Sequence, residues 1–203
     1  MKEANMILMG GNSAPKAYSQ PVAPPTHYYI YSPVSEEIPD YVEMIHHLDC
    51  AMPGEEIHIH LATPGGSMET AIAIVHAIMR SNATVVGHAD ATVASAGTII
   101  FLACSGWMVY NYSSFMFHDG SLGTPPMKFN ESKKMIDHTM EMYSQICHEM
   151  YGIIMTDDEI ENIINGHDVY MKYDEMKRRL EEYAEFIKSE SEKEETETVC
   201  IDC

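Results

Sequence analysis

Three residues with the chemistry of a serine hydrolase follow predicted strands or turns far apart in the chain. Ser95 lies where a strand gives way to an apolar helix, His118 follows the run 114–117, and Asp168 follows the helix stop Asn165-Gly166. Histidine has the near-neutral pKa that a base for a serine hydroxyl needs, and a carboxylate can orient its ring. Taken singly, each residue also fits a plainer role, as a helix cap or as a surface side chain.

Asp119 is a second candidate for the orienting carboxylate. It is the immediate sequence neighbour of His118, so its side chain is expected to point elsewhere. Asp168 is therefore the preferred residue of the two.

A glycine pair offers a place where an oxyanion could bind. The segment Thr63–Gly66 reads Thr-Pro-Gly-Gly and joins a predicted strand, 57–62, to a predicted helix, 67–80. Two consecutive glycines leave backbone N–H groups approachable, and the start of a helix adds partial positive charge. By itself the turn would suit a phosphate, a thioester or a peptide.

Strand-like and helix-like runs alternate along the chain, which is typical of an α/β domain. The 203 residues, 45% of them apolar, suffice for one domain with its own core. We expect a flexible arm at 1–26, the domain at 27–180 and an acidic, disordered tail at 181–203. Strands are predicted at 28–31, 57–62, from 84, at 107–112 and at 114–117, and helices at 39–51, 67–80, 94–104, 130–151, 156–164 and 174–188.

Composition excludes several classes of function. The formal net charge of −19 argues against binding nucleic acid or an anionic membrane through a basic patch. Five scattered cysteines do not form a disulfide framework, and neither a signal peptide nor a membrane span is visible. We therefore expect a soluble, cytoplasmic protein. Cys200 and Cys203 form an isolated C-x-x-C, which is weak evidence for a metal or redox site.

Several histidines alternate on predicted strands without forming a recognisable metal motif. His58 and His60 share a face, but no carboxylate or third histidine is spaced convincingly with them. We interpret them as strand residues near an interface, assign no role to His46, His47 or His88, and predict no metal and no cofactor. The methionines of helix 130–151 indicate a core or a subunit interface rather than a binding surface.

The segments described above together resemble ClpP, the proteolytic subunit of the Clp protease, over about residues 28–171. The run 57–66 resembles the family's strand ending in Ser-Pro-Gly-Gly, with Thr63 in place of serine. Ala94-Ser95-Ala96 resembles the segment of the nucleophile, and 115–118 the strand that ends in the catalytic histidine. His167–Met171 resembles the segment that carries the aspartate. One such motif is weak evidence, but four in order are strong evidence.

The resemblance implies a catalytic triad of Ser95, His118 and Asp168, with the backbone N–H groups of Gly66 and Ala96 as the oxyanion hole. It implies a spiral of βαβ units with a protruding helix, here 130–151, that interlocks two stacked heptameric rings. It also implies unfolded protein or peptide substrates, an AAA+ ATPase unfoldase as partner, and a cytoplasmic location, the host's if the chain is phage-encoded.

The chain departs from the family pattern at several positions, as divergent and phage-encoded relatives do. Ala91 replaces a usual glycine four residues before the nucleophile, and the glycine-rich strand after the histidine is shortened to 119–126. The run 177–180 replaces the family's usual close, and the arm 1–26 does not match its axial loops. These differences affect three properties that the resemblance implies: binding of an extended substrate strand, contacts between subunits of the ring, and coupling to an ATPase.

Three other functions compete with a serine endopeptidase. A crotonase-type acyl-CoA enzyme shares the spiral fold and the paired N–H groups, but it has no need of the triad. A signal-peptide-peptidase type enzyme pairs serine with lysine, and no lysine lies between Gly66 and Met127. A catalytically silent ring subunit, acting as a scaffold or regulator, remains the main alternative.

Overall fold

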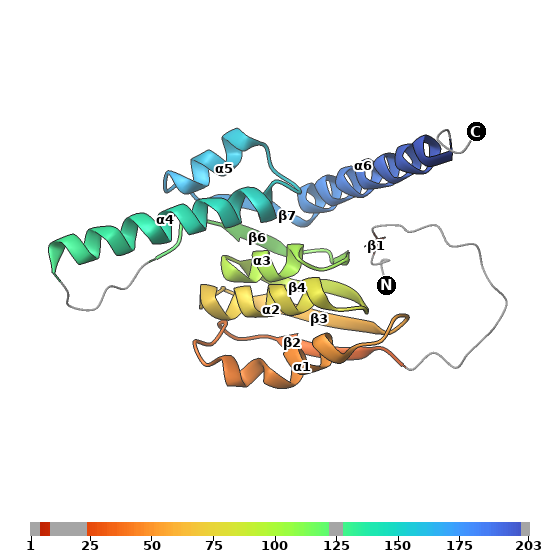
Figure 1. Ribbon diagram of the computed structural model, residues 1–203, viewed down its shortest axis with the longest axis horizontal. Coiled ribbons are helices and arrows are strands. Elements are labelled where there is room, and N and C mark those ends of the chain that lie inside the picture. Colours follow the sequence, from red (N-terminus) through yellow and green to blue (C-terminus); the bar gives the residue numbers. More distant parts are fainter. Residues whose placement is uncertain (1–4, 9–23, 122–127, 200–203) are drawn as a thin grey trace.

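A single sheet of seven strands runs through the part of the chain that the computed structural model describes, residues 5–8, 24–121 and 128–199 (Figure 1). Its path is β1-β5-β4-β3-β2, and β6 and β7 extend it from β4. The strands are β1 (Asn5–Leu8), β2 (Thr26–Ile30), β3 (Glu56–Thr63), β4 (Thr84–Ala94), β5 (Gly106–Val109), β6 (Ser114–Phe117) and β7 (Val169–Lys172). The helices are α1 (Val42–Cys50), α2 (Met68–Arg80), α3 (Ala96–Leu102), α4 (Phe129–Tyr151), α5 (Asp157–Ile164) and α6 (Tyr173–Val199), and a 3-10 turn, η1 (Ile38–Tyr41), precedes α1.

The central strands are parallel and are connected through helices, which confirms the α/β class. β2, β3, β4 and β5 pair in parallel, and β6 is parallel to β4, whereas β1 and β7 pair antiparallel with β5 and β6. A parallel connection needs a crossover, and α1, α2 and α3 supply it on one face of the sheet.

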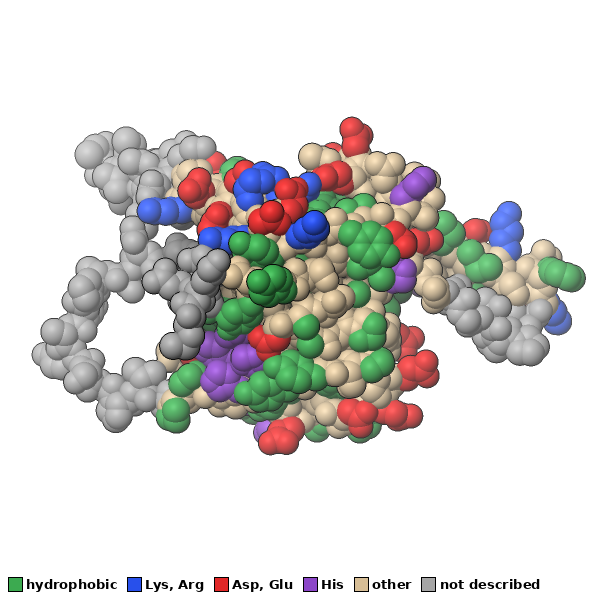
Figure 2. Space-filling view, turned by 180° about the vertical axis from the view of Figure 1, so that it is seen from behind, with side chains coloured by type: hydrophobic (Ala, Val, Ile, Leu, Met, Phe, Trp, Pro, Cys, Tyr) green, Lys and Arg blue, Asp and Glu red, His purple; other side chains and the backbone are tan. Residues whose placement is uncertain are grey.

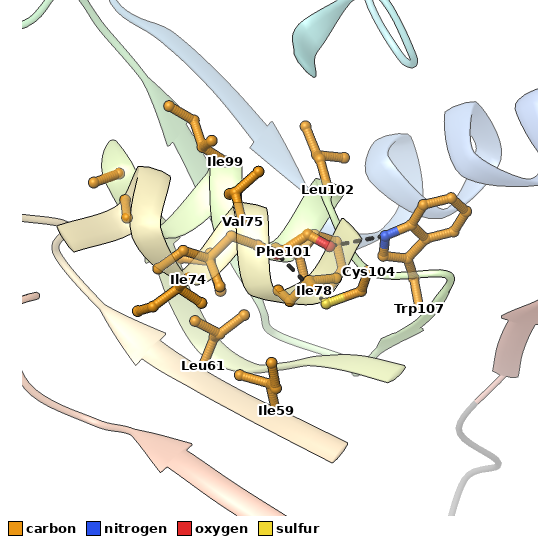
Figure 3. Close-up of a cluster of buried hydrophobic side chains, with 14 of the residues drawn as sticks. Ile59, Leu61, Ile74, Val75, Ile78, Ile99, Phe101, Leu102, Cys104 and Trp107 are labelled. Carbon is orange, nitrogen blue, oxygen red and sulfur yellow. Dashed lines mark hydrogen bonds between the residues drawn. The ribbon is translucent and has the colours of Figure 1, made fainter. Parts of the chain in front are cut away.

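The core lies between the sheet and these three helices. In β3 the residues Ile57, Ile59 and Leu61 are fully buried, while their neighbours face the other side. Figure 3 shows Ile59 and Leu61 directed toward α2. At the far end of this cluster the indole N–H of Trp107 donates to the carbonyl oxygen of Phe101 at 2.9 Å, so the buried polar atom has a partner.

β4 changes partner halfway along its length. Its residues Val86–Ala89 pair with β5, and its residues Thr92–Ala94 pair with β6. The register with β3 shifts between Leu61 and Thr63, which is the sign of a bulge. One long strand therefore carries the sheet from its first half into the smaller β6–β7 extension.

α4 projects away from the body of the molecule (Figure 1). Its last turns are anchored by three buried side chains, Tyr143, Cys147 and Tyr151. Toward its start, apolar side chains are exposed: Phe129, Ile136, Met140 and Met142. The predicted helix 130–151 is thus confirmed, with its two halves in different environments.

The structure departs from the sequence prediction at both ends of the chain. Within the predicted flexible arm 1–26, Asn5–Leu8 forms β1, and β2 already begins at Thr26. The last helix does not end near Lys188 but continues to Val199, so most of the segment expected to be a disordered tail is helical. The reason is that no glycine or proline interrupts 173–199 and glutamate is a good helix former.

None of the helices in the described part of the chain combines the length and the apolar character that crossing a bilayer requires.

An arginine joins α5 to α6. Thr156 and Glu159 form a capping box at the start of α5, within the predicted helix 156–164. The guanidinium of Arg179 binds both carboxylate oxygens of Glu159 at 2.7 Å and donates to the Ile154 carbonyl oxygen at 2.8 Å. These hydrogen bonds, chiefly from Arg179, lower the pKa of Glu159 from 4.5 to about 2.

We expect Glu159→Gln to reduce the free energy of unfolding at pH 7 by about 1–2 kcal/mol, because it removes a charged bidentate pair that is only partly screened by water. The folded-state pKa is depressed, so this contribution is complete above pH 4.5 and disappears as the pH falls toward 2. Urea unfolding of both proteins across this range measures it.

Glu182→Gln is the matched control, because Glu182 pairs with Arg178 on the surface, where its side chain is 61% exposed. It should cost less than about 0.5 kcal/mol. A gap between wild type and Glu159→Gln that stays constant from pH 7 to pH 2 would show that the ion pair is not its cause.

Candidate active site

Ser95 occupies a sharp turn between β4 and α3. Its backbone angles are φ 51° and ψ −127°, a conformation that side-chain-bearing residues rarely adopt. Its N–H donates to the Met116 carbonyl oxygen at 2.8 Å, and its carbonyl oxygen accepts from the Thr98 hydroxyl at 2.6 Å. Strained strand-to-helix turns of this kind present a serine hydroxyl to a cleft in α/β-hydrolases.

The side chain of Ser95 does not cap the helix that follows it. No cap hydrogen bond is formed, and within the described residues its hydroxyl has no hydrogen-bond partner. The common structural role of a serine at a helix start is therefore not the role of this one. Its side chain is half-buried, with the hydroxyl available for chemistry.

The Thr-Pro-Gly-Gly turn packs against the Ser95 turn. A Cβ on Gly65 would lie 2.6 Å from the Ser95 Cβ and 2.7 Å from the Ala94 carbonyl oxygen. Gly65 also has φ +92°, so glycine is required there both by its backbone conformation and by the close approach. The Thr63 hydroxyl donates to the Ser32 carbonyl oxygen at 2.7 Å and accepts from the Gly65 N–H at 3.1 Å. Thr63 thus fixes the turn through its hydroxyl.

Two backbone N–H groups near Ser95 have no partner within the described residues. The Val34 N–H donates to the Gly65 carbonyl oxygen, and the Val34 carbonyl oxygen accepts from the Ser67 N–H. This pairing leaves the N–H of Gly66 without a partner among the described residues. The N–H of Ala96, the first residue of α3, has no hydrogen bond either. Unpaired N–H groups next to a free serine hydroxyl are the donors that an oxyanion requires.

Strand register brings His118 and Asp168 to the same edge of the sheet as Ser95. β4 and β6 are parallel, with Ala94 opposite Met116, so both strands end together. β6 and β7 are antiparallel, with Phe117 opposite Val169, so the residue after β6 faces the residue before β7. His118 and Asp168 are these two residues.

The three side chains are not hydrogen-bonded to one another in the described structure. His118 is half-buried and its imidazole makes no hydrogen bond there, while Asp168 is exposed and accepts only a 3.5 Å contact from Tyr170. Catalytic hydrogen bonds are often long without substrate, so the backbone arrangement is compatible with a triad that tightens later. Most of the predicted substrate-binding segment, 119–126, lies outside the described residues.

α4 holds the end of β6 through residues that sequence reasoning missed. The Tyr143 hydroxyl donates to the His118 carbonyl oxygen. The Tyr151 ring packs edge-on against the Phe117 ring, with the ring centroids 5.0 Å apart. The Tyr151 hydroxyl also lies 3.1 Å from the Thr98 hydroxyl, which bonds to Ser95. The eight-residue spacing of the two tyrosines on one helix face was the available signal, but it did not reveal what they contact.

A cavity of about 780 Å³ lies elsewhere, between α2, α3, α4 and α6, with Val75, Met79, Leu102, Ile146 and Met150 among its lining residues. It is predominantly apolar and does not include Ser95, His118 or Asp168. The cavity is therefore separate from the candidate site at the sheet edge.

A second group of polar side chains lies on the opposite face of the sheet from α1–α3. Histidines 27, 58, 60 and 88 approach one another there, beside Asp90. The sequence alone indicates no third ligand for His58 and His60 and no role for His88, whereas strand pairing places His88 directly opposite His60. The pKa of His88 is lowered to about 4, chiefly by burial of the ring, so the ring is neutral at pH 7.

We expect Gly65→Ala to disrupt the active site and to destabilise the protein by about 3 kcal/mol or more, because the added Cβ clashes with the Ser95 turn and the backbone has a positive φ. Gly54→Ala is the matched control, since Gly54 has φ +95° with nothing within 4 Å of a Cβ. The control should cost only about 1 kcal/mol. Thermal melts of the two variants compare them, and equal losses of stability would mean that the packing of Gly65 on Ser95 is unimportant.

Two comparisons with known proteins bear on these observations. A family model described as Clp protease matches residues 18–178, which is most of the chain. No curated protein matches the chain. The matched span includes the Ser95 turn, the Thr-Pro-Gly-Gly turn, His118 and Asp168, and the mixed sheet with its parallel centre agrees with the ClpP-like α/β fold that the sequence predicted.

Proposed function

The chain belongs to the Clp protease family, and from that premise we propose that it is a serine endopeptidase that cleaves peptide bonds through an acyl-enzyme. The observation that carries the proposal is the Ser95 turn. The Ser95 backbone has φ 51°, and its hydroxyl does not cap α3. Within the described residues, two N–H groups beside it have no partner. His118 and Asp168 lie at the same edge of the sheet.

In this proposal His118 takes the proton of the Ser95 hydroxyl as the oxygen attacks the scissile carbonyl carbon. The negative charge that develops on the carbonyl oxygen is stabilised by the N–H groups of Gly66 and Ala96. His118 then gives the proton to the leaving amine, the acyl-enzyme forms, and water releases the acyl group by the same steps. Asp168 orients the imidazole and stabilises its protonated form.

The proposed substrates are unfolded or partly processed protein chains in the cytoplasm. An extended peptide suits a site at a sheet edge, because its backbone can pair with backbone there. We further propose a ring-shaped homo-oligomer of stacked rings that encloses the sites, and an AAA+ ATPase unfoldase that delivers substrates to it.

A catalytically silent scaffold is the second candidate function, and one observation favours it. Among the described residues no hydrogen bond joins Ser95, His118 and Asp168, and the Asp168 carboxylate is exposed. Such a protein would keep the ring and the turn but would not form an acyl-enzyme.

We expect a fluorophosphonate or β-lactone probe to label the wild-type protein covalently and Ser95→Ala not at all. Peptide hydrolysis should fall by about 10⁴-fold or more in Ser95→Ala and in His118→Ala, and by a smaller factor in Asp168→Asn. Mass spectrometry of the labelled peptide and a fluorogenic peptide assay measure the two effects.

Ser132→Ala is the control for the probe, because Ser132 lies on α4, away from the site. It should be labelled and should cleave peptide as the wild type does. Equal labelling of wild type and Ser95→Ala, or none of either, would rule out the peptidase and leave the scaffold.

The exposed apolar side chains near the start of α4 are the proposed contact between rings. Ile136 and Met140 lie one turn apart and are 38% and 53% exposed. We expect the wild type to have the mass of a ring by light scattering, and the double variant Ile136→Glu/Met140→Glu to have a mass about half as large or smaller. Burying carboxylates in an apolar interface is costly.

Lys134→Glu is the control, since Lys134 is an exposed residue on another face of the same helix. Its mass should equal that of the wild type. A monomeric wild type would contradict the ring, whatever the activity of the protein.

A further inference from the structure

Four histidines form a ladder across three parallel strands. In the register, His27 lies opposite His58, and His60 lies opposite His88. All four project from the face that α1–α3 leave uncovered, since the alternate residues of β3 are buried on the other side. Figure 2 shows histidines gathered in one patch on this face, with apolar and acidic side chains beside them.

Two of these histidines and the neighbouring Asp90 place ligand atoms within reach of a single ion. One ligand atom from each of His60, His88 and Asp90 lies within 4.8 Å of the other two. His60 Nδ1 is 2.8 Å from Asp90 Oδ2, and the imidazoles of His60 and His88 stack with centroids 4.2 Å apart. His58 adds a third nitrogen and a fourth candidate ligand, because its Nδ1 lies 2.6 Å from His88 Nε2.

The outer atoms of the same side chains are hydrogen-bonded in the pattern seen around metal ligands. His58 Nε2 lies 2.7 Å from a Glu56 carboxylate oxygen, and His88 Nδ1 lies 2.8 Å from the Tyr110 hydroxyl. The Tyr31 hydroxyl donates at 2.5 Å to Asp90 Oδ2, the oxygen that also faces His60. Metal-binding histidines commonly bond their second ring nitrogen to a carboxylate or another polar group, which fixes the orientation of the ring.

The donor set indicates the class of ion. Three imidazoles and one carboxylate suit Zn²⁺ or a neighbouring transition ion, which four such ligands hold tetrahedrally. Mg²⁺ and Ca²⁺ prefer oxygen ligands, and only Asp90 supplies oxygen here.

We propose that this ladder is a binding site for a divalent transition metal such as Zn²⁺, with His60, His88 and Asp90 as ligands and His58 as the fourth. Tetrahedral zinc ligands lie about 3.4 Å apart, so binding would require side-chain rotations that draw the wider pairs together and open the 2.6 Å contact. The ion would join β3 to β4 on the face opposite the helices. The proposal is independent of the proposed peptidase activity.

Titration of the purified, full-length, metal-free protein with ZnSO₄ tests the site. Calorimetry should give one Zn²⁺ per chain, and His60→Gln or Asp90→Asn should weaken binding at least about 100-fold. Zn²⁺ should raise the melting temperature of the wild type and leave those of the two variants unchanged. The same results are expected in a Ser95→Ala background, so that failure of the peptidase proposal does not affect this test.

Two controls keep the result specific. His76→Gln removes an exposed histidine from α2, outside the ladder, and should bind Zn²⁺ as the wild type does. Cys200→Ser/Cys203→Ser removes the terminal thiols and should also retain binding. Co²⁺ bound to the wild type should show tetrahedral visible bands without a thiolate charge-transfer band. Absence of Zn²⁺ binding by the wild type, full binding by His60→Gln and Asp90→Asn, or loss of binding in the cysteine variant would overturn the proposal.

Discussion

The contact between Gly65 and the Ser95 turn is the constraint on which the candidate site depends. A positive φ at a serine costs of order 1–3 kcal/mol, so the surroundings must hold it. They do so from three directions: β6 through the Met116 carbonyl oxygen, α3 through Thr98, and the glycine turn through the absence of a Cβ at Gly65. Because Thr98 also contacts Tyr151, the conformation of one serine is linked to α4.

Local elements were predictable where the sequence states their start or stop. Ser67 caps α2 and Thr156 caps α5 through side-chain hydrogen bonds, and both helices lie where the pattern placed them. β7 was not predicted, because four residues with a weak alternation become a strand only when they pair with β6. For the same reason the sequence could place His118 and Asp168 after particular elements but could not say how their side chains meet.

The histidine ladder shows a second limit of sequence reasoning. His58 and His60 share a face by simple alternation within one strand, and this much was visible. His88 and Asp90 join them only through the register between β3 and β4, whose residues lie about 30 positions apart in the chain. The alternation of side chains shows which residues of one strand share a face. A set of ligands from several strands depends on strand pairing, which composition does not reveal.

The pairing of β7 with β6 also has a consequence for the order of events as the chain is made. Ser95 and His118 follow β4 and β6, which pair with each other and are separated in sequence only by α3 and β5. Asp168 joins them only after α4 and α5 have been made and β7 has paired with β6. Such long-range closure is slow relative to the formation of helices. A nascent chain that has been synthesised only through α5 holds the serine and the histidine without the aspartate. The three candidate residues are thus brought to one edge of the sheet only when most of the domain exists.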